Sequence, residues 1–125
     1  MTAYIQFHTR ARVREGELDD FLDVATRFVE AVESEPGADS CACYVDRETR
    51  TVSFFEIFHD VDAFLAHFEH PPAAALVPEM NPKIEEFERI ELFGDVPADV
   101  LDGLADKRFA VACAPEHAAF VGKDR

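Results

Sequence analysis

The sequence has no tryptophan, only three cysteines and few basic residues. Its 125 residues include 26 acidic and 12 basic side chains, which give a formal net charge of −14. No apolar run is long enough to span a bilayer, and the N-terminal residues show no signal-peptide pattern, so we expect a cytoplasmic protein. Because phosphate groups would be repelled by this charge, we expect no nucleic-acid or membrane partner.

The cysteines and histidines do not form a recognisable metal-binding pattern. Cys41 and Cys43 lie two residues apart on one face of a predicted strand, and no second C-x-C or C-x-x-C pair is near. We therefore expect free thiols that behave as small apolar residues. His59, His67 and His70 lack the i, i+4 spacing of histidines that share a metal on one helix face. The sequence therefore predicts no metal site.

Hydrophobic content and periodicity indicate a folded α+β domain. Hydrophobic residues make up 48% of the chain and twelve residues are phenylalanine, enough for a core. Alternation predicts strands over residues 4–13, 38–46, 51–59 and 87–93, while 3.6-residue spacing predicts helices from 18 to before Pro36 and from 61 to before Pro71. With right-handed crossovers, this β-α-β-β-α-β order gives a ferredoxin-like fold with a four-stranded antiparallel sheet and both helices on one face.

The third predicted strand carries apolar bulk on both faces. Phe54 and Phe58 alternate with Phe55 and Ile57, so each face of the sheet needs a cover. The helices cover one face. We expect a second copy of the chain to cover the other, which predicts a homodimer formed through the sheet face.

The chain divides at about residue 95. Residues 1–95 are predicted to form the ferredoxin-like domain, and residues 96–125 a C-terminal extension with a helix over Pro97–Leu104 and a further edge strand within Phe109–Ala114. The extension is expected to pack on the domain, close a pocket or reach across the dimer.

The segment FFEIFHDVDAFLAHFEHPP, residues 54–72, resembles the central motif of the antibiotic biosynthesis monooxygenase family, whose members are dimeric α+β barrels. This resemblance implies a homodimer in which two sheets face each other, with a pocket between sheet and helices in each subunit. It also implies oxidation of small aromatic, quinol or polyketide-like substrates by O₂ without a cofactor. His67 falls where the family has its helical histidine.

The sequence differs from two groups of relatives at positions that bear on its expected activity. Phe58 stands where haem-degrading relatives have tryptophan, and no histidine lies near Val77, where those enzymes place a catalytic one. Haem degradation is therefore not expected. Pro72 stands where quinol-oxidising relatives often carry a further histidine.

Six residues are predicted to form the site. His67 lies about 60° outside the apolar stripe of its helix, so it is expected to border a pocket and act as a base, since histidine ordinarily has a pKa of about 6.5. The alternative is a structural histidine at the edge of the core whose side chain has a hydrogen-bond partner. The expected substrate-binding residues are Phe54, Glu56, Phe58, Tyr44 and Phe64.

Glu56 and Tyr44 each have a structural alternative. Glu56 shares a strand face with aromatic residues and must be paired or raised in pKa. It is either a second acid–base group or a partner of Arg10 or Arg12. Tyr44 either binds substrate or is a tyrosine packed against neighbouring side chains.

The predicted function is a cofactor-independent monooxygenase. The alternative is a non-catalytic dimeric barrel that binds a small apolar ligand or a partner.

Overall fold

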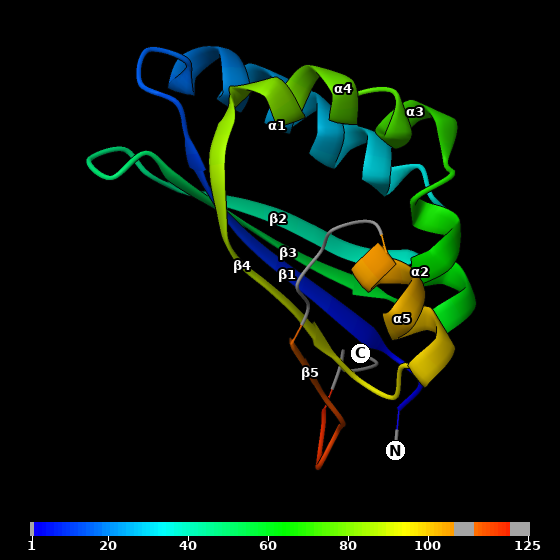
Figure 1. Ribbon diagram of the computed structural model, residues 1–125. Coiled ribbons are helices and arrows are strands. Elements are labelled where there is room, and N and C mark those ends of the chain that lie inside the picture. The colour runs from blue at the N-terminus through cyan, green and yellow to red at the C-terminus, as the bar shows by residue number, and fades with distance from the viewer. Residues whose placement is uncertain (1, 107–111, 121–125) are drawn as a thin grey trace.

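Strands and helices follow the predicted order in a computed structural model that describes residues 2–106 and 112–120 (Figure 1). The strands are β1 (Ile5–Val13), β2 (Ala38–Asp46), β3 (Thr51–Phe58), β4 (Ile84–Phe93) and β5 (Ala112–Ala114). The helices are α1 (Leu18–Glu33), α2 (Val61–His67), α3 (Pro71–Ala74), α4 (Val77–Met80), the 3-10 turn η1 (Asn81–Lys83) and α5 (Ala98–Asp106). The α+β ferredoxin-like prediction is confirmed.

The sheet has five strands in the order β2-β3-β1-β4-β5, and it is mixed. The first four strands pair antiparallel, as predicted. The four-stranded sheet predicted for the domain is extended to five strands, because β5 adds a parallel edge in which Leu92 pairs with Cys113. The sequence predicted this edge strand within Phe109–Ala114. Residues 109–111 of that range lie outside the described residues.

Local sequence explains where the helices begin and end. Asp60 caps α2, since its Oδ1 accepts the Ala63 N–H at 2.8 Å. This helix ends at His67 rather than running on toward Pro71, and Pro71 opens the separate helix α3. In α1 the predicted apolar stripe is buried at Phe21, Ala25, Phe28 and Val32, and Val24, which the predicted stripe does not include, is buried beside it.

All helices lie on one face of the sheet, where two apolar clusters form the core (Figure 1). One cluster joins α1 to the β2–β3 hairpin and includes Val13, Phe28, Val52 and Phe54. The other joins α2 and α5 to β1 and β4, and it includes Phe7, Phe58, Phe64, Leu92 and Leu104. No helix among the described residues is long and apolar enough to cross a membrane.

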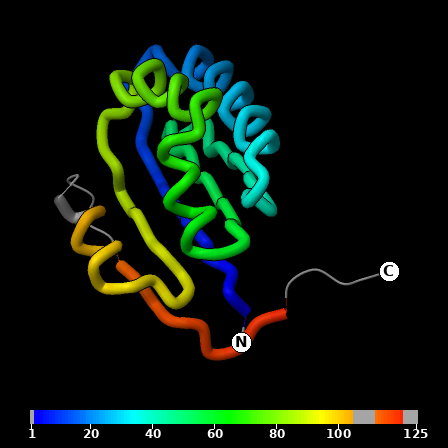
Figure 2. The backbone as a smooth tube through the Cα atoms, turned by 90° about the vertical axis from the view of Figure 1, so that its right-hand side faces the viewer, coloured from blue at the N-terminus to red at the C-terminus, as the bar shows by residue number. Residues whose placement is uncertain are grey.

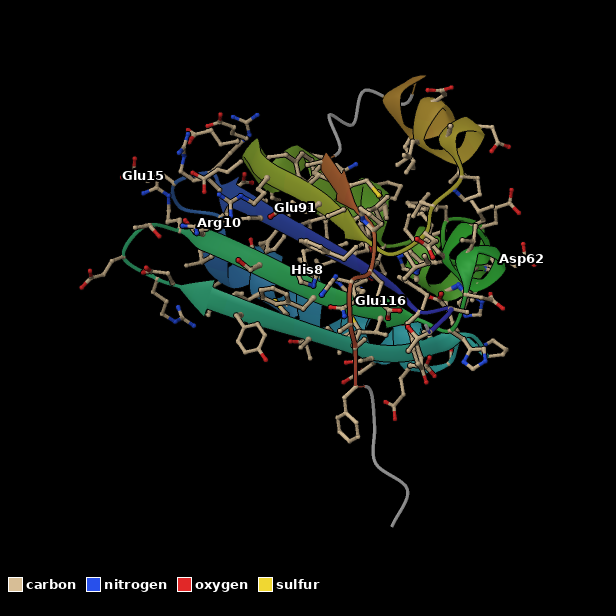
Figure 3. All side chains as sticks on the ribbon, turned by 90° about the horizontal axis from the view of Figure 1, so that it is seen from below. His8, Arg10, Glu15, Asp62, Glu91 and Glu116 are labelled. Atoms are coloured by element: carbon tan, nitrogen blue, oxygen red, sulfur yellow. The ribbon has the colours of Figure 1, made fainter. Side chains whose placement is uncertain are left out.

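The C-terminal segment returns to the start of the chain. The Thr2 N–H and hydroxyl donate hydrogen bonds of 2.9 and 2.6 Å to the carboxylate of Glu116, and the segment ending at residue 120 passes beside the N-terminus (Figure 2). Figure 3, which looks onto the helix-free face, shows this segment crossing it, with Glu116 near His8. The segment therefore covers one end of that face.

Candidate functional site

His67 lies at the C-terminal end of α2 and is enclosed by phenylalanine rings. Its side chain is 6% exposed, and its ring centroid lies 4.9, 5.5 and 5.8 Å from those of Phe58, Phe68 and Phe28. The sequence predicted a position bordering a pocket. The structure buries His67 instead, because Phe68 follows it directly and Phe28 of α1 packs against it.

Glu35, just beyond α1, holds one side of the His67 ring. Nδ1 of His67 lies 2.9 Å from both carboxylate oxygens of Glu35, and both side chains are buried. An ionised carboxylate only accepts hydrogen bonds, so Nδ1 is the donor. In the neutral ring this leaves Nε2 as the proton acceptor.

Glu56 of β3 faces the other ring nitrogen. It is 2% exposed and shares the helix-facing side of the strand with Val52, Phe54 and Phe58, as the alternation predicted. Its Oε1 lies 3.3 Å from Nε2 of His67 but is not aligned for a hydrogen bond, and it has no such partner among the described residues. Burial, and then the charge of Glu35, raise the pKa of Glu56 to about 8.

The predicted alternative for Glu56, an ion pair with an arginine of the first strand, is wrong. Arg10 and Arg12 point to the helix-free face, where they pair with glutamates of β4. Arg12 contacts three of them, Glu85, Glu86 and Glu88. Glu56 is therefore left with a histidine, a second carboxylate and apolar surroundings.

The acidic triad Glu35–His67–Glu56 can hold and move a proton in a dry environment. Glu35 fixes the ring by its bond to Nδ1, while Glu56, protonated near neutral pH, faces Nε2. A proton on Glu56 has a short path to Nε2, and the resulting imidazolium is stabilised by the Glu35 carboxylate. This is the arrangement of a base oriented by a carboxylate.

The other predicted site residues divide between the two faces of the sheet. Phe58 contacts the His67 ring directly, Phe64 packs on Phe58 at 5.7 Å, and Phe54 packs on Phe28 at 5.6 Å. Tyr44 lies on the opposite face: it is 60% exposed and its ring contacts Phe55. The structure therefore brings His67, Glu56 and the phenylalanines together and separates Tyr44 from them.

Sequence reasoning missed Glu35, Phe28 and Phe68. One signal for Glu35 exists, because it follows Val32 by three residues and so continues the buried stripe of α1 past the end of the helix. Phe28 belongs to the same stripe. A polar residue at a stripe position is the pattern that indicates a buried, paired carboxylate.

Tyr44 belongs to an aromatic stripe on the helix-free face. It consists of Tyr44, Phe55, His8 and Phe93, one residue from each of β2, β3, β1 and β4. Successive ring centroids are 5.5, 4.5 and 4.9 Å apart. Burial lowers the pKa of His8 within it, against an opposing effect of Glu91.

Two further histidines contribute to structure. His70 Nε2 lies 3.0 Å from Ser34 Oγ, and His70 precedes α3 rather than ending α2 as predicted. His59 is exposed, 3.5 Å from Asp39. Within residues 2–106 and 112–120, no group of three or more His, Cys, Asp or Glu side chains is arranged to hold a metal ion. All three cysteines are free, and Cys41 and Cys43 are partly buried.

Several surface cavities open on the described part of the chain. One of about 310 Å³ lies on the helix-free face, beside His8 and Glu116, and one of about 300 Å³ lies between α1 and β2. His67 lines neither of these two cavities, nor two further ones of about 470 and 380 Å³. The second cavity, which we call the α1–β2 groove, reaches Cys41, the pairing partner of Glu56.

Comparison with known protein families matches residues 5–79 to the antibiotic biosynthesis monooxygenase model. The chain belongs to this family. The matched region contains the whole Glu35–His67–Glu56 triad. No functionally curated protein matches the sequence significantly.

Solved structures share the family fold at low sequence identity. MupZ from Pseudomonas fluorescens matches with a TM-score of 0.77 and 20% identity over 98% of this chain and 91% of its own. An antibiotic biosynthesis monooxygenase matches with a TM-score of 0.66 and 21% identity over 74% of this chain and 99% of its own. Rv0793 from Mycobacterium tuberculosis matches with a TM-score of 0.67 and 12% identity over 75% of this chain and 96% of its own. The MupZ match thus extends over the C-terminal segment, whereas the other two cover about three quarters of the chain.

Proposed function

We propose that this member of the family is a cofactor-independent monooxygenase that oxidises a small phenol, quinol or polyketide-like aromatic with O₂. The observation that carries the proposal is the buried His67, whose Nδ1 is fixed by Glu35 so that Nε2 is available as a base. The phenylalanine rings around it exclude water, which favours charge transfer steps that bulk solvent would intercept.

The chemistry begins with removal of a phenolic proton. The proton passes to His67, and the resulting anion gives one electron to O₂ to form superoxide and an aryloxyl radical. The two radicals combine into a peroxide. For an anthrone reacting through its enol, the peroxide carbon still bears a hydrogen. His67 returns its proton to the peroxide, and loss of water then leaves a ketone, so that one oxygen atom enters the product and the other leaves as water.

We further propose that the protein acts as a homodimer through its helix-free face. The aromatic stripe of Tyr44, Phe55, His8 and Phe93 gives that face a continuous apolar band. Phe55 on the interior strand β3 is 40% exposed and Tyr44 on the edge strand β2 is 60% exposed, so two large rings of this band face solvent in the single chain. A second copy related by a two-fold axis would bury both stripes together.

The alternative is a non-catalytic barrel that binds a small apolar ligand or a partner. One observation favours it: His67 is buried and lines none of the four described cavities. The alternative predicts no oxygen consumption with any phenolic compound. The two functions are therefore separated by one assay.

The test is oxygen uptake with a panel of hydroquinones and anthrones, with and without added flavin or metal. The proposal predicts uptake that needs no addition and that falls about 100-fold or more in His67→Gln, since general-base catalysis contributes about 10²–10⁴-fold. His67→Gln keeps a donor for Glu35, whereas His67→Ala leaves that carboxylate unpaired.

His59→Gln is the matched control, because His59 is exposed and lies outside the triad. It should retain the parent rate. Folding of each variant is verified by circular dichroism. Unchanged uptake in a folded His67→Gln or His67→Ala would remove His67 from the mechanism, and absence of uptake across the panel would favour the non-catalytic alternative.

A further inference from the structure

The triad is enclosed, so a substrate needs a defined way in. Glu35 and His67 are each 6% exposed and Glu56 is 2% exposed. On the His67 side the rings of Phe28, Phe58 and Phe68 block the approach. On the side of the triad that faces β2, the residue opposite Glu56 is the small Cys41.

Cys41 connects the triad to a cavity. It pairs with Glu56 in the β2–β3 register, and directly opposite residues on one sheet face have Cβ atoms about 5 Å apart. The charges of Glu56 and Glu35 both add to the effect of burial in raising the pKa of the Cys41 thiol, as expected for close neighbours. Cys41 also lines the α1–β2 groove. Cys41 therefore lies both in the lining of the groove and beside Glu56 in the sheet.

The groove has the character of a ligand site for an uncharged molecule. Val29, Val32, Ala38 and Cys41 give it an apolar floor, while Glu33, Asp39 and Ser40 supply a polar rim. Its described lining contains two carboxylates and no lysine or arginine, so an anion would be repelled. Its volume of about 300 Å³ is at the small end of ligand pockets, which suits a molecule with one ring.

Glu56 offers the polar partner that such a molecule would need. Its Oε1 is buried and makes no hydrogen bond among the described residues. Because Oε1 faces Nε2 of His67, a ligand hydroxyl would donate to the other carboxyl oxygen, Oε2, and that hydrogen bond would offset part of the free-energy cost of burying the group.

We propose that the α1–β2 groove is the substrate site, and that an uncharged phenol enters it to place its hydroxyl on Glu56 beside Cys41. This inference rests on the proposed function and adds a role for Glu56. The phenolic proton moves to Glu56 as the proton already on Glu56 moves to Nε2 of His67. One proton leaves the phenol and one arrives on His67, so Glu56 ends as it began and the phenolate is formed next to it.

Binding is measured without oxidation, by amide chemical shifts during titration with phenol and with hydroquinone under argon. The expected result is saturable shifts centred on residues 29–33 and 38–41. Addition of a carboxylate, as in 4-hydroxybenzoate, should weaken binding about tenfold or more, equivalent to about 1.4 kcal/mol. Shifts centred on the cavity beside His8 and Glu116, or no saturable shifts, would overturn the proposal.

Val29→Phe and Ser40→Phe fill the groove from α1 and from β2, and each should raise the Kd for phenol about tenfold or more. Leu22→Phe is the matched control for Val29→Phe: it lies two turns earlier on the same helix face, packs on the same cluster and is outside the groove. Its Kd should stay within about twofold of the parent. Unchanged affinity in folded Val29→Phe and Ser40→Phe would contradict the assignment.

The outcomes separate this inference from the proposed function. Phenol bound in the groove without oxygen uptake would uphold the site and reject the oxidation. Oxygen uptake at the parent rate in both groove-filling variants would uphold the oxidation and reject the site.

Discussion

Glu56 is a carboxyl group that its surroundings keep protonated near neutral pH. Burial and the charge of Glu35 raise its pKa from 4.5 to about 8. Between these two values the folded chain binds more protons than the unfolded chain, so stability falls as pH rises. The stabilisation is complete below about pH 4.5 and is lost as pH passes through about 8.

This reasoning gives a stability prediction. The free energy of unfolding of the parent should fall by an amount on the order of a few kcal/mol between pH 6 and pH 9, and Glu56→Gln, which cannot ionise, should remove most of that slope. Urea unfolding at several pH values measures both. Glu48→Gln, an exposed turn residue, should leave the slope intact. Parallel pH profiles for the parent and Glu56→Gln would show that Glu56 does not titrate in this range.

Residue patterns predicted part of the triad and not its geometry. The period-two alternation of the third strand placed Glu56 among aromatics, and the family motif marked His67. The partner Glu35 lies 32 residues before His67, and their contact depends on how the end of α1 meets α2. The periodicity of each helix does not predict this contact between Glu35 and His67. The same holds for Phe28, whose stripe position predicts burial but not the ring that it covers.

At the scale of elements, the turn before β2 approaches α2 as closely as a glycine permits. A Cβ added at Gly37 would collide with the Cβ of Ala63, and the Gly37 carbonyl accepts the His59 N–H at 2.8 Å. This contact fixes the distance between α2, which carries His67, and the hairpin that carries Glu56. Gly37 therefore sets part of the geometry of the triad.

Gly37→Ala should cost about 1–3 kcal/mol of folding free energy through overpacking, and adding Ala63→Gly should recover part of the loss. Gly103→Ala is the contrasting change, because a Cβ there meets nothing within 4 Å on α5. It should stabilise the protein by about 0.5–1 kcal/mol. Chemical denaturation of these three variants and the parent measures these effects, and equal behaviour of Gly37→Ala and Gly103→Ala would contradict the close contact.

Element order was predictable because each main element has a strong period, from the stripe of α1 to the alternation of β1. The residues at which the elements begin and end were harder to predict. The helix carrying His67 stops at that residue although its apolar pattern continues to Phe68. β5 lies within the range predicted for an edge strand, but its three described residues are all exposed and its bounds are set by pairing with β4. Such pairing is a tertiary effect that alternation does not report.

For the whole molecule, the strong negative charge and the aromatic stripe have opposite effects on self-association. A charge of −14 on each chain favours separation. The stripe concentrates apolar area where Arg10 and Arg12 are already neutralised by glutamates of β4. We therefore expect the helix-free face to associate with its own copy, and association to strengthen with salt as the net charge is screened.

Sedimentation equilibrium tests this association directly. The parent should have twice the 14.0 kDa chain mass, and Phe55→Glu should be monomeric, because a two-fold axis places both introduced carboxylates in one apolar interface. Leu65→Glu is the matched control: Leu65 is 41% exposed, close to the 40% of Phe55, but it lies on α2. It should remain dimeric. A monomeric parent would contradict the predicted dimer. Dissociation by Leu65→Glu and not by Phe55→Glu would show that the dimer does not form through the aromatic stripe.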